Sequence, residues 1–471
     1  MTEAGDRTLL TAVAEAVGET IEHRRSAPVA PPIDEAALRD RLAAYDFVDP
    51  RRIQDVAEDL LDLLQQFAVR SDHPRYFGLF NPPATAAGIA ADLITAAINP
   101  QLAVWSHAPA AAEIERKLVK LFGSFVWPDQ EIAGTFTSGG SEANSTALLS
   151  ALASRYPNWD HEGLPRSGAL PVIYVSSEAH LAWIKIARMC GLGSSAVRLV
   201  PPEDGLRLTG EMLARAIDAG ETAPVLLVAT AGTTAHGAID DIEGIVAVGR
   251  GVGAHVHVDA AWAGGALVSP ARRSLFAGIE RADSVTIDPH KWLATPMGAG
   301  LYLARDWKPL ERAFAVSTGY MPPASSERRD AYIHSVQWSR RFIGGKLFLT
   351  LAAEGLDGCR DMVERAFVLG DELRSRLRDL GWRILNHTPL PLICFVPEDT
   401  SDDCVSAIER EVVASGAAWI SSVRLEGRRV LRACITSFET TEQDLDALVL
   451  ALERARAHVT ERDVQTARSK Y

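Results

Sequence analysis

The stretch Asp288-Pro289-His290-Lys291-Trp292 follows the apolar run Ser284-Val285-Thr286-Ile287, and the fold prediction starts from this pair. The run has the length and the β-branched content of a buried strand. A lysine that follows such a strand and a Pro-His turn would hold its amine at the carboxyl edge of an α/β sheet, where ligands bind. Most single lysines are surface residues, so the neighbouring sequence must decide whether Lys291 is functional.

Strand-like runs alternate with helical patterns before Lys291. Continuous apolar runs occupy residues 171–175, 224–229 and 255–258, and a capped amphipathic helix is expected at 241–248. Alternation of this kind is typical of a buried, mostly parallel sheet covered by helices. The predicted fold class is therefore α/β.

Helical patterns dominate both ends of the chain. Apolar stripes between residues 7 and 70 predict a helical arm, interrupted by an extended Pro-rich linker at 26–32. The arm could pack on a partner subunit or on its own domain. The C-terminal part predicts a small α+β domain, with helices at 346–355, 363–380 and 441–459 and short strands near 392–396 and 430–435.

These patterns divide the chain into three parts. We expect residues 1–75 to form the N-terminal helical arm, residues 76–344 the large domain that contains Lys291, and residues 345–471 the small C-terminal domain. A length of 471 residues is ample for two domains with cores of their own.

Composition argues against several classes of protein. The chain has 48 Lys+Arg against 61 Asp+Glu, a net charge of −13, which disfavours nucleic-acid binding. The arginine doublets, such as Arg340-Arg341, are scattered and are expected on the solvated surface. Five widely spaced cysteines without a C-x-x-C motif predict reduced thiols and no metal site. With no signal-peptide pattern and no long apolar run, we expect a cytoplasmic protein without a membrane partner.

Three motifs upstream of Lys291 supply groups that a phosphate-bearing cofactor needs. Gly139, Gly140 and Ser141 precede a helix, whose first N–H groups can bind phosphate. The run 231–234 places threonine hydroxyls after a strand, and Asp259 ends another, where a buried carboxylate needs a partner. Each motif alone could be an ordinary cap or turn. In this order, with Lys291, they favour a pyridoxal phosphate site, in which the lysine forms the Schiff base and the aspartate keeps the pyridine nitrogen protonated.

At these motifs the sequence resembles the group II pyridoxal-phosphate-dependent amino acid decarboxylases, which include aromatic, glutamate, sulfinoalanine, histidine and diaminobutyrate decarboxylases. The likeness runs from His73 to the C-terminal helix. It implies the aminotransferase type I fold with a mostly parallel, seven-stranded type of sheet. It also implies a homodimer with active sites at the interface and a swapped arm, and α-decarboxylation of an L-amino acid to an amine and CO2. The shared motifs are Thr-Ser-Gly-Gly-Ser-Glu-Ala-Asn at 137–144, Ser-Glu-Ala-His at 177–180, Ala-Gly-Thr-Thr at 231–234, His-Val-Asp-Ala-Ala-Trp at 257–262 and Asp-Pro-His-Lys-Trp at 288–292.

The resemblance assigns roles to individual residues. Lys291 and Asp259 keep the roles given above, and His180 would stack on the cofactor ring; without the motif it would be predicted as a core histidine. Asp288 stands where many members have Asn, so its carboxylate would need to turn away from the phosphate or find a donor. The residues implied around the cofactor are Gly139, Gly140, Ser141, His180, Thr234, Asp259, Ala261, Asp288, His290 and Lys291.

The family also carries a loop tyrosine that protonates the α-carbon. Tyr332 matches it if a gap of one residue is allowed, and Tyr320 is the alternative. In the family, loss of this tyrosine goes with oxidative deamination to an aldehyde. The predicted catalytic residues are therefore Lys291, Asp259, His180 and Tyr332.

Four residues are implied for the substrate pocket: Phe80, Trp105, His107 and Arg432. Arg432 occupies the position that holds the substrate carboxylate in the glutamate-type branch, and an arginine fork suits that task. Otherwise it is a surface arginine at a strand edge. The motifs leave the substrate open among aromatic, acidic and diamino acids. The alternatives to decarboxylation are aldehyde-forming deamination, transamination, a C–C lyase reaction or a non-catalytic scaffold, and Lys291 argues against the last.

Overall fold

The computed structural model describes residues 3–165, 170–203, 206–219, 224–316, 328–398 and 400–468. The chain packs into two compact units. The larger unit contains residues 84–370 and 386–392. The smaller unit contains residues 1–83, 371–385 and 393–471, so the N-terminal segment and the C-terminal strands and helices belong to the same unit.

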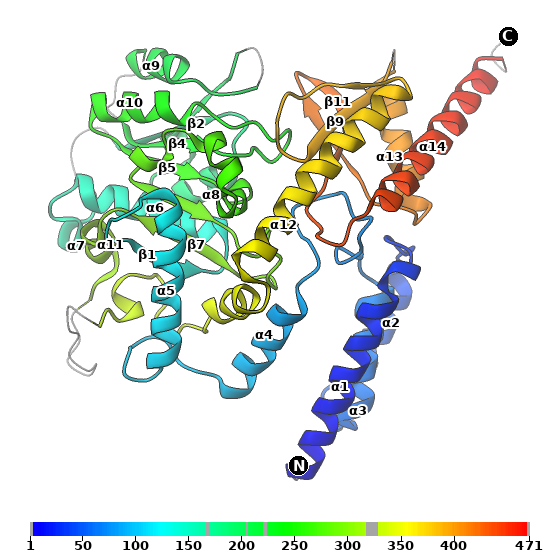
Figure 1. Ribbon diagram of the computed structural model, residues 1–471, viewed down its shortest axis with the longest axis horizontal. Coiled ribbons are helices and arrows are strands. Elements are labelled where there is room, and N and C mark those ends of the chain that lie inside the picture. The colour runs from blue at the N-terminus through cyan, green and yellow to red at the C-terminus, as the bar shows by residue number, and fades with distance from the viewer. Residues whose placement is uncertain are drawn as a thin grey trace. The chain divides into compact units, whose positions relative to one another are not determined.

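A seven-stranded sheet forms the centre of the larger unit (Figure 1). The strand order is β1-β7-β6-β5-β4-β2-β3, and all neighbours from β6 to β3 are parallel. Strand β7 pairs antiparallel with both β1 and β6. The predicted α/β class with a mostly parallel sheet is confirmed. The strands are β1 (Ala133–Thr137), β2 (Val172–Ser176), β3 (Val197–Val200), β4 (Pro224–Thr230), β5 (His255–Asp259), β6 (Ser284–Ile287) and β7 (Gly300–Ala304).

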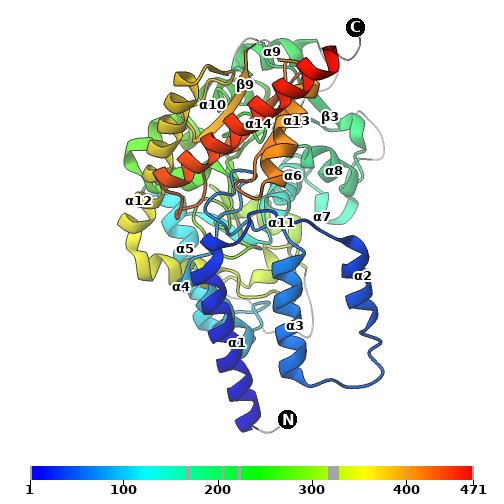
Figure 2. The same ribbon diagram turned by 90° about the vertical axis from the view of Figure 1, so that its right-hand side faces the viewer.

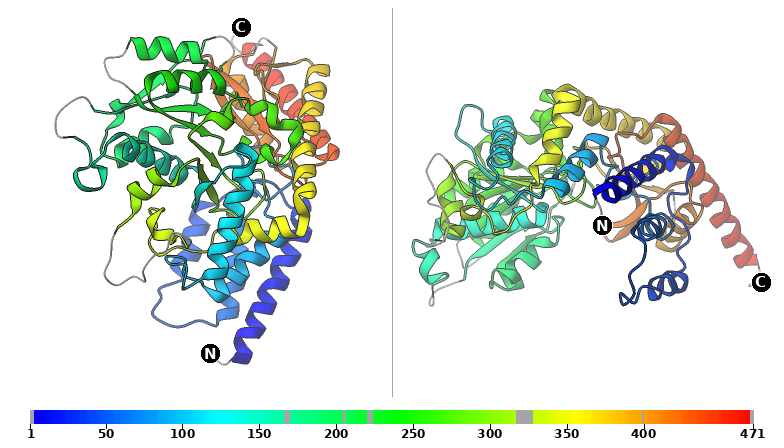
Figure 3. Two further views of the ribbon diagram at one scale, coloured as in Figure 1. Left: turned by 60° about the vertical axis from the view of Figure 1, so that its left-hand side comes forward. Right: turned by 90° about the horizontal axis from the view of Figure 1, so that it is seen from below.

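Helices cover both faces of this sheet, as two further views show (Figure 3). Because successive strand residues point to opposite faces, β5 identifies the two layers. Val256 faces α10 (Ile242–Val252), where Gly249 leaves no room for a Cβ. His257 faces α6 (Gly140–Arg155), to which it is hydrogen-bonded. Further α-helices of this unit are α4 (Ala86–Ile98), α5 (Pro109–Val126), α7 (Trp159–Glu162), α8 (Ala182–Met189), α9 (Gly210–Asp218) and α11 (Trp307–Phe314).

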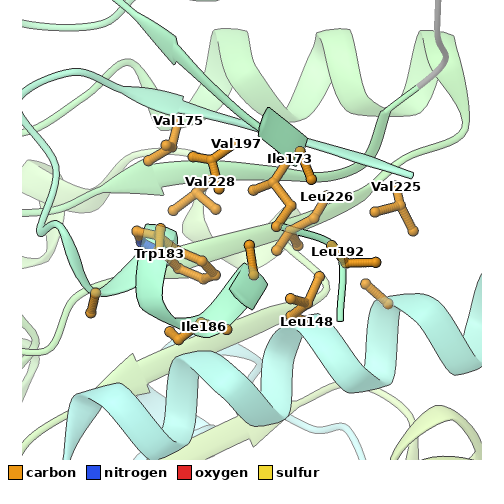
Figure 4. Packing of buried hydrophobic residues seen from close by; sticks show 14 of the residues in the cluster. Leu148, Ile173, Val175, Trp183, Ile186, Leu192, Val197, Val225, Leu226 and Val228 are labelled. Carbon is orange, nitrogen blue, oxygen red and sulfur yellow. The ribbon is translucent and has the colours of Figure 1, made fainter. Parts of the chain in front are cut away.

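An apolar core packs between α6, α8 and strands β2, β3 and β4 (Figure 4). Trp183 of α8 is 1% exposed, and Leu148 of α6 and Ile173 of β2 are fully buried. Burial of each large apolar side chain contributes about 1.5–3 kcal/mol. This core therefore fixes α6 on the sheet, and with it the position of the first turn of that helix.

The smaller unit combines a four-stranded sheet with helices, which confirms the helical arm and the small α+β part. Helices α1 and α3 run side by side (Figure 2), and Gln65 donates to Thr20 across them. In the linker, the Val29 N–H donates to the Gly416 carbonyl at 3.0 Å. The sheet order is β10-β11-β9-β8. The elements are α1 (Glu3–His23), α2 (Glu35–Ala43), α3 (Ile53–Gln66), β8 (Trp382–Ile384), β9 (Leu392–Pro397), α13 (Asp402–Ala414), β10 (Ser421–Leu425), β11 (Arg428–Cys434) and α14 (Glu442–Arg468).

The two helices expected at 346–355 and 363–380 are confirmed as the two segments of α12 (Gly344–Asp379), which are separated at Gly355, whose φ of 70° suits glycine; the second segment begins earlier than expected. One local expectation was wrong. The expected solvation of the arginine doublets fails at Arg24 and Arg340, which are 8% and 4% exposed. Each is ion-paired, to Glu439 and Glu115 respectively, because a buried charge requires a partner. Among the described helices, none is both long and apolar enough to cross a membrane.

Candidate active site

Lys291 lies in the turn that follows β6. Its Nζ is 3.0 Å from Oδ2 of Asp288, a side chain that is 2% exposed, and its backbone N–H closes the turn by donating to the Asp288 carbonyl. His290 Nδ1 lies 2.6 Å from the carbonyl oxygen and 3.2 Å from the backbone nitrogen of Ala299, and burial lowers the pKa of this histidine. The turn is thus fixed from both sides around the lysine amine.

The first turn of α6 lies against the Lys291 turn. A Cβ on Gly140 would come within 2.9 Å of Asp288 Oδ2, and one on Gly139, with φ of 154°, within 3.2 Å of the His290 ring. The first N–H groups of a helix lack partners inside the helix. Here the start of α6 approaches the Lys291 turn so closely that side chains larger than glycine would not fit at 139 and 140. This cradle of glycines beside a lysine fits the phosphate of pyridoxal phosphate.

Asp259 ends β5 with 5% of its surface exposed. Its Oδ2 accepts from Asn144 Nδ2 at 2.8 Å, and its Oδ1 accepts from the Ala261 N–H at 3.2 Å. The carboxylate is therefore buried and partnered, as its position at the end of an apolar strand required. Asn144 was part of a quoted motif, but no role had been predicted for it.

The motifs at 177–180 and 231–234 meet through a pair that the sequence reasoning missed. His236 Nε2 lies 3.3 Å from Glu178 Oε2, and this hydrogen bond lowers the pKa of Glu178. The His236 ring is also within 3.2 Å of Thr233 Oγ1, and half-buried Thr234 follows in the same turn. His180 is exposed, and its Nδ1 accepts from the Ala182 N–H, so the alternative of a core histidine is wrong.

The segments of Tyr332 and Trp105 meet in the larger unit. The Tyr332 N–H donates to the Ala103 carbonyl, and its buried ring lies 5.1 Å from that of Trp338. The Trp105 N–H donates to Asp330 Oδ1 at 2.7 Å, two residues before Tyr332. Neither side chain has a hydrogen bond or ring contact with the Lys291 turn in the described part of the chain. His107, two residues after Trp105, is exposed. Tyr320, the alternative loop tyrosine, lies outside the described residues.

Arg432 and Phe80 lie together in the smaller unit. Arg432 is on β11 and 1% exposed, so the alternative of a surface arginine is wrong. Its guanidinium donates to the Gly78 carbonyl and stacks over the Phe80 ring, 5.0 Å from the ring centre. Stacking and a backbone acceptor hold the planar fork in one orientation.

Comparison with known proteins decides the family. Residues 39–397 match the family described as the pyridoxal-dependent decarboxylase conserved domain. The chain belongs to the pyridoxal-dependent decarboxylases. It is 32% identical over 340 residues to the cysteine sulfinic acid decarboxylase of Mus musculus, covering 70% of this chain and 68% of that protein. It is 25% identical over 458 residues to the aromatic-L-amino-acid decarboxylase of Bacillus atrophaeus, covering 93% of each. The crystal structure of mouse CSAD superposes with a TM-score of 0.90 at 26% identity, covering 97% of this chain and 99% of that one.

This decarboxylase is therefore a pyridoxal-phosphate-dependent carboxy-lyase of fold type I, as the resemblance implied. The other chemistries left open on the same cofactor are not favoured by these relatives. The residues predicted around the cofactor follow the carboxyl ends of strands in the large sheet or lie at the start of α6. The residues added by the structure are Asn144, His257, Glu178 and His236. The alternation His-Val-His-Val-Asp along β5 was the available sequence signal for His257.

Proposed function

We propose that this enzyme removes the α-carboxylate of an L-amino acid and releases the amine, using the residues around Lys291 and Asp259. The observation that carries the proposal is that the Lys291 turn and Asp259 both contact the start of α6. Gly140 lies against the Lys291 turn, and Asn144, one turn later, is hydrogen-bonded to Asp259. Bound pyridoxal phosphate supplies a ring that withdraws the electron pair left behind by CO2.

The chain's residues have separate tasks in this proposal. Lys291 holds the cofactor covalently, and the N–H groups of Gly139, Gly140 and Ser141 bind its phosphate. Asp259 keeps a proton on the ring nitrogen, so that the ring stays electron-withdrawing. His180, whose side chain is exposed, would stack on the cofactor ring.

The second group of residues acts on the substrate. Tyr332 donates a proton to the α-carbon after CO2 leaves, and Arg432 binds a carboxylate of the substrate through its oriented guanidinium. We further propose a homodimer in which the segments of Trp105 and Tyr332, hydrogen-bonded to each other's neighbours, serve the partner's pocket.

The test combines trapping with a substrate panel. Borohydride reduction of the holoenzyme should attach the cofactor to Lys291, as peptide mass analysis would show. The variant Lys291→Ala should lose this label, whereas Lys308→Ala, at the start of α11, should retain it. Aromatic, acidic and diamino acids are then incubated with the enzyme, and CO2, ammonia and peroxide are measured together. CO2 without ammonia is expected; equal ammonia would overturn amine release. Tyr332→Phe should raise the ammonia fraction, and an unchanged ratio would remove Tyr332 from the mechanism.

A further inference from the structure

Four polar side chains, three of them buried and His255 partly buried, form a continuous line that ends on Asp259. His255 Nε2 lies 2.7 Å from Ser284 Oγ, and the same oxygen is 2.8 Å from His257 Nδ1. His257 Nε2 lies 3.1 Å from Asn144 Oδ1, and Asn144 Nδ2 lies 2.8 Å from Asp259 Oδ2. We call His255, Ser284, His257 and Asn144 the His257 relay. Its members come from β5, β6 and α6.

The sheet geometry explains why these residues meet. Residues 255, 257 and 259 alternate along β5 and therefore share one face. Register pairing places Ser284 opposite His257, and α6 covers this face, with Asn144 3% exposed. His257 is fully buried among aromatic rings, with Trp183 edge-on at 5.8 Å and Tyr302 stacked at 6.5 Å. A polar line inside such a core must satisfy its own hydrogen bonds.

The hydrogen bonds of the relay can run in only one direction. Burial lowers the pKa of His257 well below its usual range, so the ring is neutral and has one donor. The reverse orientation of the Asn144 amide would set its oxygen against the Asp259 carboxylate, two acceptors at hydrogen-bond distance. The amide oxygen therefore faces His257, Nε2 carries the ring proton, and Nδ1 accepts from the Ser284 hydroxyl. Thr286 Oγ1, 3.2 Å from Nε2, can accept from the same N–H.

We propose that Asn144 and His257 are positioning residues for the cofactor, which act by holding Asp259 as an oriented carboxylate. His257 fixes the Asn144 amide, and the amide N–H stabilises the charged form of Asp259 on Oδ2. An Asp259 carboxylate held in this way would keep a proton on the ring nitrogen of the bound cofactor. This inference rests on the proposed role of Asp259 and extends it to residues that do not touch the cofactor.

The experiment measures the affinity of the cofactor-free protein for pyridoxal phosphate and the absorption spectrum of the bound form. Asn144→Leu, which keeps the shape and removes the donor, should weaken binding about tenfold to a hundredfold, as expected for a hydrogen bond to a charged group. His257→Leu should have a similar effect. His257→Gln, whose amide can donate from the position of Nε2, should recover part of the loss. Thr146→Val is the control, since this buried hydroxyl of α6 donates to the Glu142 carbonyl and lies outside the relay.

The outcomes separate this inference from the proposed function. Weak binding in Asp259→Asn, Asn144→Leu and His257→Leu, with partial recovery in His257→Gln, supports both. Normal binding in Asp259→Asn would overturn the role of Asp259 itself. Weak binding in Asp259→Asn with normal binding in Asn144→Leu would overturn only the relay, as would equal losses in His257→Leu and His257→Gln. Thermal melting of each cofactor-free variant identifies loss of folding, and if His257→Leu does not fold, Asn144→Leu decides alone.

Discussion

The ion pair between Glu115 of α5 and Arg340 is buried inside the larger unit, with side-chain exposures of 6% and 3%. Arg340 also donates to Thr135 Oγ1 at 2.8 Å and to the Phe136 carbonyl at 3.1 Å. Glu115 Oε1 accepts the Gly344 N–H at the start of α12. Burial raises the pKa of Glu115 even beside the guanidinium. A buried ion pair contributes little net stability, but removal of one partner leaves an uncompensated charge. This pair and its hydrogen bonds join α5, β1 and the start of α12.

The charge change Glu115→Gln keeps an acceptor for the Gly344 N–H but leaves the Arg340 charge unpaired. Removal of one partner of a buried ion pair lowers the free energy of unfolding by about 3–5 kcal/mol. Because Arg340 keeps two other acceptors, Thr135 Oγ1 and the Phe136 carbonyl, we expect a loss of about 3 kcal/mol here. Replacing Arg340 as well, by Met, removes the unpaired charge, so the double variant should recover about 2 kcal/mol. Urea unfolding of the holoenzyme, followed by circular dichroism, measures these differences from the midpoints.

A matched control lies on the surface of α2. Glu35 and Arg39 form an ion pair with side-chain exposures of 73% and 74%. Because exposed pairs contribute little, Glu35→Gln should change the unfolding free energy by less than about 0.5 kcal/mol. The reasoning is refuted if Glu115→Gln costs less than about 1 kcal/mol, or if the double variant with Arg340→Met is no more stable than Glu115→Gln alone.

Two further predictions concern a histidine and a glycine. Burial lowers the pKa of His73 to about 4, so this histidine takes up its proton at a lower pH in the folded chain than in the unfolded chain. Between pH 7.5 and pH 5 this difference should lower the free energy of unfolding by about 2 kcal/mol. His73→Asn should reduce the pH dependence of the urea midpoint. The control His161→Asn, at a side chain that is 87% exposed, should leave it unchanged. If the two variants show the same pH dependence, His73 is not its cause. A Cβ on Gly300 would lie 2.6 Å from the backbone of Gly139, so Gly300→Ala should weaken pyridoxal phosphate binding about tenfold. Gly251→Ala, where an added Cβ meets no atom within 4 Å, is the control. If titration of the two cofactor-free variants with pyridoxal phosphate gives the same affinity, this steric coupling is contradicted.

Much of the cofactor site could be predicted from local sequence. The strand at 284–287 has the predicted bounds, and the turn with Lys291 follows it as expected. The glycines at 139 and 140 begin α6, and Asp259 is a buried strand end with partners. These predictions succeed because strand length, glycine at a tight turn and a carboxylate after an apolar run are each properties of a few adjacent residues.

The partners of those residues were decided by tertiary structure. Asn144 reaches Asp259 and His257 across more than a hundred residues of chain, only because β5 lies inside the sheet with α6 on one face. For the same reason Arg340 and Arg432, predicted or allowed as surface residues, are buried. A sequence shows which groups can carry charge or accept a proton. Whether a group is solvated, and which distant group shares its hydrogen bond, depends on strand order and helix placement, which set the local dielectric and the neighbours together.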